Sequence, residues 1–378
     1  MSCAYWNPTR RLIEEGALDK LAEELSASGA AKVLVVLGEK SFRKSIRYTK
    51  LRDTLEHFSL VESEPVVKDP SLVFAQSFAE KYRGKAIDSV VAIGGGSVMD
   101  MAKLTALLLN QPDDTWNTFW RDPVVPIEFP NASLPLVAVP TTAGTGSEVT
   151  QYASFEDHQH QKMSFAHPYL FPKLALVDPE LAVSMPPAIT ASTGFDALSQ
   201  AIEAYWSIHH MPSSDTHALR AIPLVLEQLQ RAVEKPADRD ARFAMAIAGN
   251  EGGLAIAQTR TTAVHSVSYP MTTIFHVPHG HACALTLASF VRFNQDAIEH
   301  ERAAALWRAL GAENAEMAAK HIEGLMDNVG LERRLSQVGI DEEGLESIVK
   351  YGFRPDRVKN NPRELNASQL RTMLVEIL

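Results

Sequence analysis

Long hydrophobic runs, cysteine and positive charge are all scarce in this 378-residue chain. No stretch approaches the roughly 20 apolar residues that cross a bilayer, and the N-terminus lacks the apolar core of a secretory signal, so we expect a cytoplasmic protein with no membrane partner. The only two cysteines, Cys3 and Cys283, exclude a disulfide framework and a CxxC metal cluster. With 36 Lys and Arg against 46 Asp and Glu, the net charge of −10 argues against a nucleic-acid partner.

The remaining composition is that of an ordinary globular protein, and the length suits two domains. Up to residue 187, short runs rich in Val and Leu alternate with helical patterns over residues 16–28, 71–82 and 97–110. Strands buried on both faces of a parallel sheet are apolar throughout. Four runs have this character: 32–38, 89–95, 134–140 and 174–179. The alternation predicts an α/β domain with a parallel sheet over residues 1–187.

From residue 188 onward, the alternation gives way to helical periodicity without a convincing strand. The pattern predicts an all-helical domain over residues 188–378. Its expected helices cover residues 193–206, 214–233, 238–258, 299–310, 314–329 and 341–352.

Two small-residue loops follow consecutive buried strands of the predicted sheet. The first, Gly94-Gly95-Gly96-Ser97, ends a strand and opens a helix, where glycines let the backbone approach a diphosphate and free N–H groups favour negative charge. The second offers hydroxyls to a ribose, phosphate or nicotinamide amide, at Thr141, Thr142, Thr145 and Ser147. Each loop alone could be a ligand-free turn. Together, at the ends of neighbouring strands, they favour a dinucleotide site.

Four of the 13 histidines fall close together, at His265, His276, His279 and His281. Clustered histidines beside a helix that carries carboxylates indicate a metal or proton-transfer site. Asp196 and Gln200 lie four residues apart, on one face of a predicted helix. The alternative is a helix-capping Asp196 and no metal.

Several motifs resemble the group III, iron-containing alcohol dehydrogenase family in order and spacing over essentially the whole chain. The resemblance implies a dinucleotide-binding α/β domain followed by a helical domain, with the active site in the cleft, and NAD(P)H-dependent reduction of an aldehyde to a primary alcohol. We also expect a homodimer. The motifs are GGGSVMDMAK (94–103), VPTTAGTGSEVT (139–150), TGFDALSQAIEAYWS (193–207), VPHGHACAL (277–285) and NNPRELNASQL (360–370).

The family's metal ligands fall by position on Asp196, Gln200, His265 and His279, which implies a divalent iron or zinc ion. Gln200 replaces the family's usual histidine, and an amide oxygen is a weaker ligand than an imidazole. His276 or His281 are candidates to compensate. Tyr269 stands where many members carry a proton-relaying histidine, so we expect Tyr269 and His279 to be catalytic.

The same resemblance distributes the cofactor over the α/β domain. The diphosphate is expected on Gly94, Gly95, Gly96 and Ser97, the nicotinamide ribose near Lys162, and the nicotinamide end near Asp100, which has both a binding and a catalytic role. Gly38 leaves room for a 2′-phosphate that Lys40 or Arg43 could pair with, although Glu39 argues the other way. We expect NADPH, with NADH usable.

Residues 255–287 resemble most closely the branch that reduces phosphonoacetaldehyde to 2-hydroxyethylphosphonate. In that interpretation Arg260 and Thr261 bind the phosphonate, and Arg354 and Arg357 form a second source of positive charge. Three alternatives remain: an alcohol dehydrogenase for another substrate, a dehydroquinate-synthase-like cyclase, and a nucleotide-binding protein without catalysis.

Overall fold

The computed structural model describes residues 5–39, 42–121, 128–157 and 162–378. The chain divides into two compact units. We call residues 7–141 and 147–181 the α/β unit, and residues 5–6, 142–146 and 182–378 the helical unit. The loop 142–146 therefore belongs to the helical unit although both of its flanks belong to the other. Lys40 lies outside the described residues.

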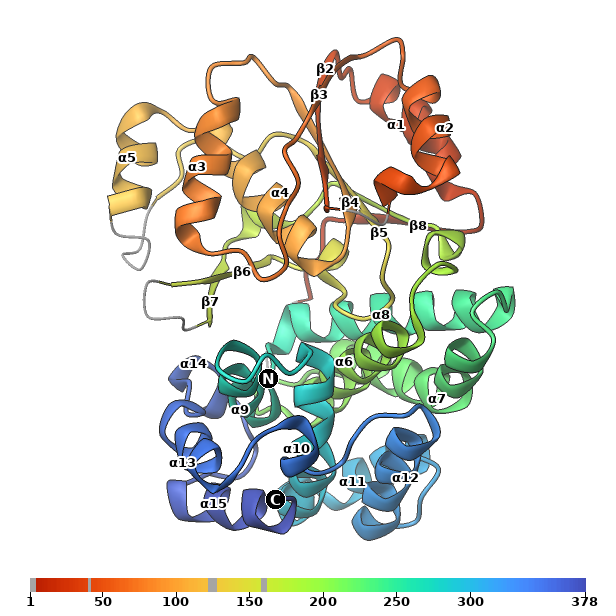
Figure 1. Cartoon of the computed structure of the whole chain (residues 1–378), viewed down its shortest axis with the longest axis vertical. Coiled ribbons are helices and arrows are strands. Elements are labelled where there is room, and N and C mark those ends of the chain that lie inside the picture. The colour runs from red at the N-terminus through yellow and green to blue at the C-terminus, as the bar shows by residue number, and fades with distance from the viewer. Residues whose placement is uncertain (1–4, 40–41, 122–127, 158–161) are drawn as a thin grey trace. The chain divides into compact units, whose positions relative to one another are not determined.

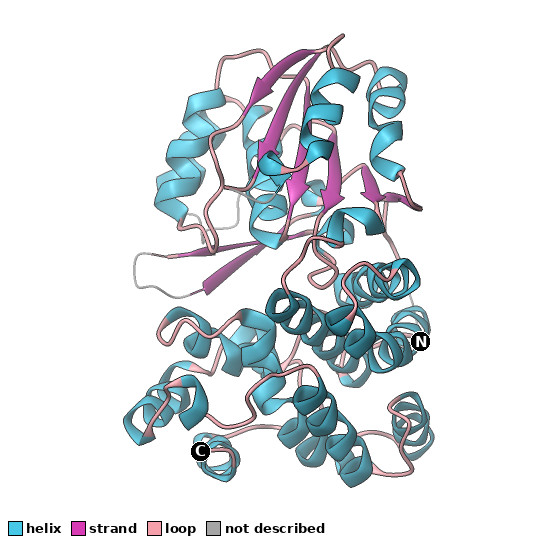
Figure 2. Cartoon of the chain, turned by 45° about the vertical axis from the view of Figure 1, so that its right-hand side comes forward, coloured by secondary structure: helices cyan, strands magenta, loops and turns pink. Residues whose placement is uncertain are grey.

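A six-stranded, fully parallel sheet forms the centre of the α/β unit (Figure 2), in the order β1-β8-β5-β4-β2-β3. The four predicted apolar runs are its four inner strands, and they are buried on both faces. The two edge strands were not predicted. Each has only four residues, and none of these residues is buried. The strands are β1 (Arg10–Ile13), β2 (Lys32–Leu37), β3 (Ser59–Glu62), β4 (Ser89–Gly94), β5 (Leu136–Pro140) and β8 (Leu174–Val177).

Helices cover both faces of this sheet (Figure 1). In β2, Leu34 and Val36 pack with α3, α4 and α5, whereas Val33 and Val35 pack with α1 and α2, as the two-residue period of a strand requires. A separate antiparallel hairpin, which the sequence did not suggest, joins β6 (Tyr152–Glu156) to β7 (Lys162–Ala166). The helices are α1 (Leu21–Ala27), α2 (Ile46–Thr54), α3 (Leu72–Tyr82), α4 (Gly96–Leu109) and α5 (Asp113–Arg121).

The helical unit has no strand among its described residues, as predicted. The predicted helices are present, but α6 begins at Pro187, six residues early, because proline fits a first helical turn. Four helices were not predicted: α9, α10, α14 and α15. The helices are α6 (Pro187–Trp206), α7 (Pro212–Glu234), α8 (Arg239–Thr259), α9 (Ala263–Thr273), α10 (His279–Asn294), α11 (His300–Ala309), α12 (Ala315–Asn328), α13 (Glu342–Tyr351), α14 (Pro355–Val358) and α15 (Ala367–Glu376).

Within the part of the chain that the structure describes, none of these helices combines the length and apolar character needed to span a bilayer. The longest helices of the helical unit, α6, α7 and α8, instead pack against one another around a shared apolar core. Helix α6 is almost entirely buried, and this places its polar side chains inside the unit.

Candidate metal centre and cofactor residues

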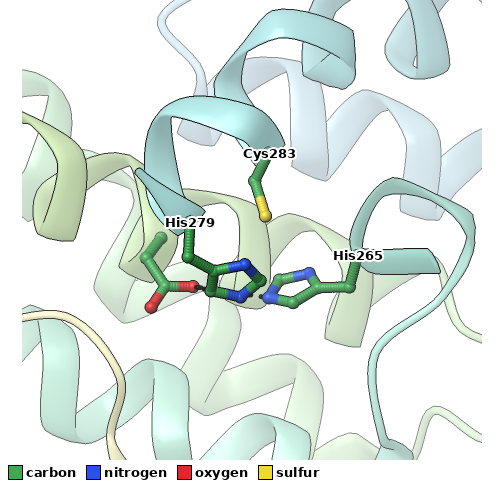
Figure 3. Close-up of side chains that lie close together, drawn as sticks. His265, His279 and Cys283 are labelled. Atoms are coloured by element: carbon green, nitrogen blue, oxygen red, sulfur yellow. Dashed lines mark ion pairs between the residues drawn. The ribbon is translucent and has the colours of Figure 1, made fainter. Parts of the chain in front are cut away.

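Four potential metal ligands from three helices meet inside the helical unit. Asp196 comes from α6, His265 from α9, and His279 and Cys283 from α10, with ligand atoms that all lie within 4.8 Å of one another. The His265 Nε2 atom is 3.3 Å from Asp196 Oδ1, and the His279 Nε2 atom is 4.0 Å from it. Figure 3 shows the Cys283 sulfur pointing toward the two imidazoles. The structure thus brings Asp196, His265 and His279 together, keeps Gln200 beside Asp196, and adds a thiol.

Cys283 is a potential ligand that the sequence analysis did not single out. It lies four residues after His279 in α10, and residues at this spacing share one face of a helix. The same spacing identified Asp196 and Gln200 as neighbours. It would also have identified His279 and Cys283 if α10 had been predicted.

Gln200 lies next to the cluster with its amide nitrogen inward. The Nε2 atom donates to Asp196 Oδ1 at 3.1 Å. The Oε1 atom is buried and has no hydrogen-bond partner among the described residues. The cluster beside this amide offers one carboxylate, two imidazoles and a thiol, a donor set that fits a divalent transition metal.

Glu203, one turn beyond Gln200 on α6, holds His265 in position. Its Oε1 atom accepts from the Thr262 N–H at 2.9 Å, the Thr262 hydroxyl at 2.8 Å and the His265 N–H at 3.2 Å. Its Oε2 atom contacts His265 Nδ1. A carboxylate on Nδ1 fixes the proton there and leaves Nε2, which faces Asp196, available to a metal.

The cluster is electrostatically coupled. Burial opposes charge on His265, but Cys283, Glu203 and Asp196 raise its pKa well above the ordinary value. Burial also raises the pKa of Asp196, yet the imidazoles of His265 and His279 outweigh burial and hold that pKa below its ordinary value. Burial raises the pKa of the Cys283 thiol. A buried carboxylate between two imidazoles is a site in which a cation can replace protons.

The other two clustered histidines do not compensate for Gln200. The His281 Nε2 atom lies 2.8 Å from the Glu332 carbonyl oxygen, and His276 is not part of the ligand cluster. Neither candidate therefore joins the ligand cluster, because α10 turns His281 to another face of the helix and His276 is exposed. The Tyr269 ring stacks on His279 with ring centroids 6.1 Å apart, so the predicted catalytic phenol lies beside a ligand.

In the α/β unit, the starts of the two small-residue loops lie side by side. Gly94 at the end of β4 pairs with Pro140 at the end of β5, and the Thr141 N–H donates to the Gly94 carbonyl at 2.9 Å. Gly94 must be glycine, since a Cβ there would meet Val98 Cγ2 at 2.5 Å. The expected adjacency of the two loops at neighbouring strand ends is present.

Asp69, which the sequence analysis did not single out, connects two predicted cofactor residues. The Ser97 hydroxyl accepts from the Asp69 N–H at 3.1 Å, and the Lys162 amine lies 3.0 Å from Asp69 Oδ1. The Asp69 backbone has a positive φ of 48°. The glycine turn and Lys162 are therefore neighbours.

Asp100, Lys103 and Ser147 form a second polar cluster in the α/β unit. The Ser147 hydroxyl donates to Asp100 Oδ1 at 2.8 Å, and the Ser154 N–H donates to Oδ2 at 2.9 Å. The Lys103 amine, fully buried in α4, donates to Ser147, to the Thr150 hydroxyl and to the Tyr152 carbonyl. Burial raises the pKa of Asp100 and lowers the pKa of Lys103 to about 8.

The remaining predicted cofactor residues are Gly38, Thr142 and Thr145, with Arg43 beside Gly38. Arg43 donates to the Gly38 carbonyl at 3.3 Å and also pairs with Glu62. Thr142 and Thr145 lie in the loop that packs with the helical unit. A Cβ on Gly146, whose φ is 58°, would lie 2.3 Å from the Cα of Gly253 in α8, so glycine is required there.

The predicted substrate residues share one part of the helical unit. Arg260 ends α8 with a φ of 59°, and the Thr261 carbonyl accepts from the Asn360 amide at 3.0 Å. The Arg354 N–H donates to the Ser266 hydroxyl at 2.7 Å, beside ligand His265. Arg357 is buried and pairs with Asp356 at 2.7 Å, which neutralises much of its charge. Arg260 thus lies just before α9, and Arg354 is hydrogen-bonded to the first turn of α9.

Comparison with known proteins matches both halves of the chain to one family. Residues 8–179 match the iron-containing alcohol dehydrogenase family, and residues 190–378 match the C-terminal part of the Fe-containing alcohol dehydrogenase family. The chain belongs to the iron-containing alcohol dehydrogenase family. This member is an NAD(P)-dependent alcohol dehydrogenase, and its substrate is a small-molecule alcohol or aldehyde.

Individual relatives of this iron-containing alcohol dehydrogenase align over nearly their whole length. It is 32% identical to long-chain-alcohol dehydrogenase 1 of Geobacillus thermodenitrificans, over 95% of this chain and 92% of the relative. It is 31% identical to the NADPH-dependent butanol dehydrogenase of Clostridium saccharobutylicum, over 92% of each chain. Its fold matches the sulfoacetaldehyde reductase of Bifidobacterium kashiwanohense in complex with NAD⁺, with a TM-score of 0.92, 34% identity and coverage of 100% and 99%.

Proposed function

We propose that this enzyme reduces an aldehyde that carries an anionic group on its α-carbon. The proposed substrate is phosphonoacetaldehyde, and the product is 2-hydroxyethylphosphonate. A chain with a net charge of −10 repels such a substrate at long range. Recognition must therefore come from a few cations that act at short range. Arg260 is the first of these, and Arg354 is the second.

The observation that carries the proposal is the backbone of Arg260. Its φ of 59° is a conformation that glycine adopts freely and that costs any other residue about 1–3 kcal/mol. This chain nevertheless has an arginine there, at the turn that leads from α8 into α9 and its ligand His265. Such strain is characteristic of functional sites, and a guanidinium is the group that best matches a phosphonate. The fold similarity to a sulfoacetaldehyde reductase adds support, since that substrate is also an anionic aldehyde.

The chain's own residues would orient the reacting groups. A divalent ion on Asp196, His265 and His279 would supply Lewis-acid polarisation of the carbonyl, and reduced nicotinamide would supply the hydride. Glu203 holds the Nδ1 atom of His265 and thereby directs its Nε2 atom at Asp196, where a metal would take the place of the Nε2 proton. The Tyr269 phenol, stacked on His279, is a hydrogen-bond donor for the developing alkoxide.

The test compares kcat/KM for phosphonoacetaldehyde, sulfoacetaldehyde and propanal. Phosphonoacetaldehyde should be strongly preferred, and Arg260→Ala should remove about 2–4 kcal/mol of transition-state binding for it while changing propanal little. Arg371→Ala, which removes a surface arginine paired with Glu346, is the matched control. Equal values for phosphonoacetaldehyde and propanal in the unmodified enzyme would refute the proposal. A preference for sulfoacetaldehyde would refute the phosphonate and keep the anionic class.

For the cofactor we propose NADPH, with NADH usable. Gly38 directly follows β2 and has no side chain, and the Arg43 guanidinium donates to its carbonyl oxygen. An arginine at this position can pair with a 2′-phosphate, although Glu62 competes for it. Arg43→Ala should reduce the ratio of kcat/KM for NADPH to that for NADH, whereas a clear preference of the unmodified enzyme for NADH would overturn the proposal.

A further inference from the structure

The position of Cys283 bears on the metal centre independently of which aldehyde the enzyme reduces. We propose that the Cys283 thiolate, and not the Gln200 amide, is the fourth protein ligand of the metal, which gives an Asp-His-His-Cys set that favours zinc. The site would then hold one oxygen, two nitrogens and one sulfur. Imidazole and thiolate together suit Zn²⁺.

The geometry of the three other ligands leaves room for a tetrahedral ion. Ligand atoms about 2.0–2.3 Å from a tetrahedral ion lie roughly 3.3–3.8 Å from one another. The separations of Asp196 Oδ1 from the Nε2 atoms of His265 and His279, 3.3 and 4.0 Å, are close to this range. All four ligand atoms lie within 4.8 Å of one another. Cys283 Sγ can therefore bind the same ion if its distances to the other three ligand atoms shorten by about 1 Å or less.

The surroundings of Cys283 favour a ligand over a bystander. The residue is completely buried, so its thiol does not reach solvent. It shares a face of α10 with His279, one turn away, and Figure 3 shows its sulfur directed at the two imidazoles. Two side chains of one helix that converge on one point, with two more from α6 and α9, form a cage built on rigid elements.

Gln200 is the less suitable fourth ligand. The Gln200 amide directs its NH₂ group at Asp196, with Nε2 3.1 Å from Oδ1. An NH₂ group of an amide cannot bind a cation. Its Oε1 atom lies toward Gly252 of α8, 3.7 Å from the place of a Cβ on that glycine. In this arrangement the amide serves Asp196 as a hydrogen-bond donor, and the ligand that replaces the family's histidine comes from α10.

The experiment uses cobalt as a spectroscopic probe in the full-length enzyme. After removal of bound metal, Co²⁺ is titrated and absorption is recorded. Thiolate ligation produces an intense sulfur-to-cobalt charge-transfer band in the near ultraviolet, which oxygen and nitrogen ligands do not give. We expect this band in the unmodified enzyme and in Gln200→Ala. In Cys283→Ser the band should be absent, and Zn²⁺ affinity measured by competition with a chelator should fall about 100-fold or more.

Cys3→Ser is the matched control, because it removes the chain's other cysteine and should keep the band. Circular dichroism of Cys283→Ser and Cys283→Ala separates loss of a ligand from loss of fold. A band that is absent from the unmodified cobalt enzyme, or that persists in folded Cys283→Ser, overturns the proposal. Loss of Zn²⁺ affinity in Gln200→Ala with no change in Cys283→Ser would assign the fourth ligand to the amide instead. None of these results depends on the substrate.

Discussion

Replacing Lys103 by Met tests whether a buried amine makes the enzyme more stable at alkaline pH. The Lys103 side chain is 1% exposed, and burial lowers its pKa from 10.5 to about 8. Between these two values the unfolded chain binds a proton that the folded chain does not. The free energy of unfolding should therefore rise with pH across this window and be constant with respect to this group below it.

The magnitude follows from the two pKa values. The full difference of 2.5 pKa units corresponds to about 3 kcal/mol, of which about 2 kcal/mol is regained between about pH 7 and about pH 9.5. In Lys103→Met no proton is taken up, and this contribution disappears. In Lys103→Arg the charge persists throughout. Relative to both variants, the unmodified enzyme should gain about 2 kcal/mol over that pH range.

The assay is urea unfolding of the metal-free enzyme at several pH values, with each variant compared with the unmodified chain at the same pH. This comparison cancels the titration of all other groups. Lys81→Met, which removes a lysine that is half exposed, should leave the pH dependence unchanged. Unmodified and Lys103→Met curves that stay parallel from neutral to alkaline pH would refute the reasoning, since Lys103 would then be charged in the folded enzyme.

Three further substitutions test the two sites. Gly95→Val should abolish NAD(P)H binding in a fluorescence titration and leave the fold intact, because it blocks approach of the diphosphate to the turn; unchanged affinity would place the cofactor elsewhere. Gln200→His should tighten Zn²⁺ binding, measured by chelator competition, because it places an imidazole beside Asp196; a weaker site would contradict this expectation. Glu203→Gln should weaken Zn²⁺ binding about 10–100-fold, because the carboxylate that orients His265 is lost; unchanged affinity would make Glu203 purely structural.

The parts of the fold that were predictable are those with a strong hydrophobic period. The four inner strands are buried on both faces, so each has a continuous apolar run of at least four residues that is visible in the sequence. Edge strands β1 and β3 pair on one side only and carry exposed residues, which removes that signal. Helices α9 and α10 are buried nearly all round, so polar residues do not mark one face of them, and Pro270 lies inside α9.

The site residues that lie at fixed positions of a family motif were predictable, and the other site residues were not. Asp196, His265 and His279 meet as the family motifs imply. Asp69 and Cys283 could not be found in that way, because their roles depend on which segments the fold brings together. Asp69 reaches Lys162 across 93 positions of the sequence. Cys283 becomes a candidate only once α10 is known to direct it at His265.

The loop 142–146 has a consequence for any attempt to divide the enzyme into its two halves. Both family matches leave it on the N-terminal side of the boundary, yet its glycines fill the surface of the helical unit. Gly144 approaches Thr193 of α6, and Gly146 approaches Gly253 of α8, so closely that neither has room for a side chain. A helical fragment that begins at residue 182 would leave this glycine-lined surface of α6 and α8 open to solvent. The C-terminal half thus matches the family in sequence but is incomplete as a folded body, because residues 142–146, which cover this surface, lie in the other half of the sequence.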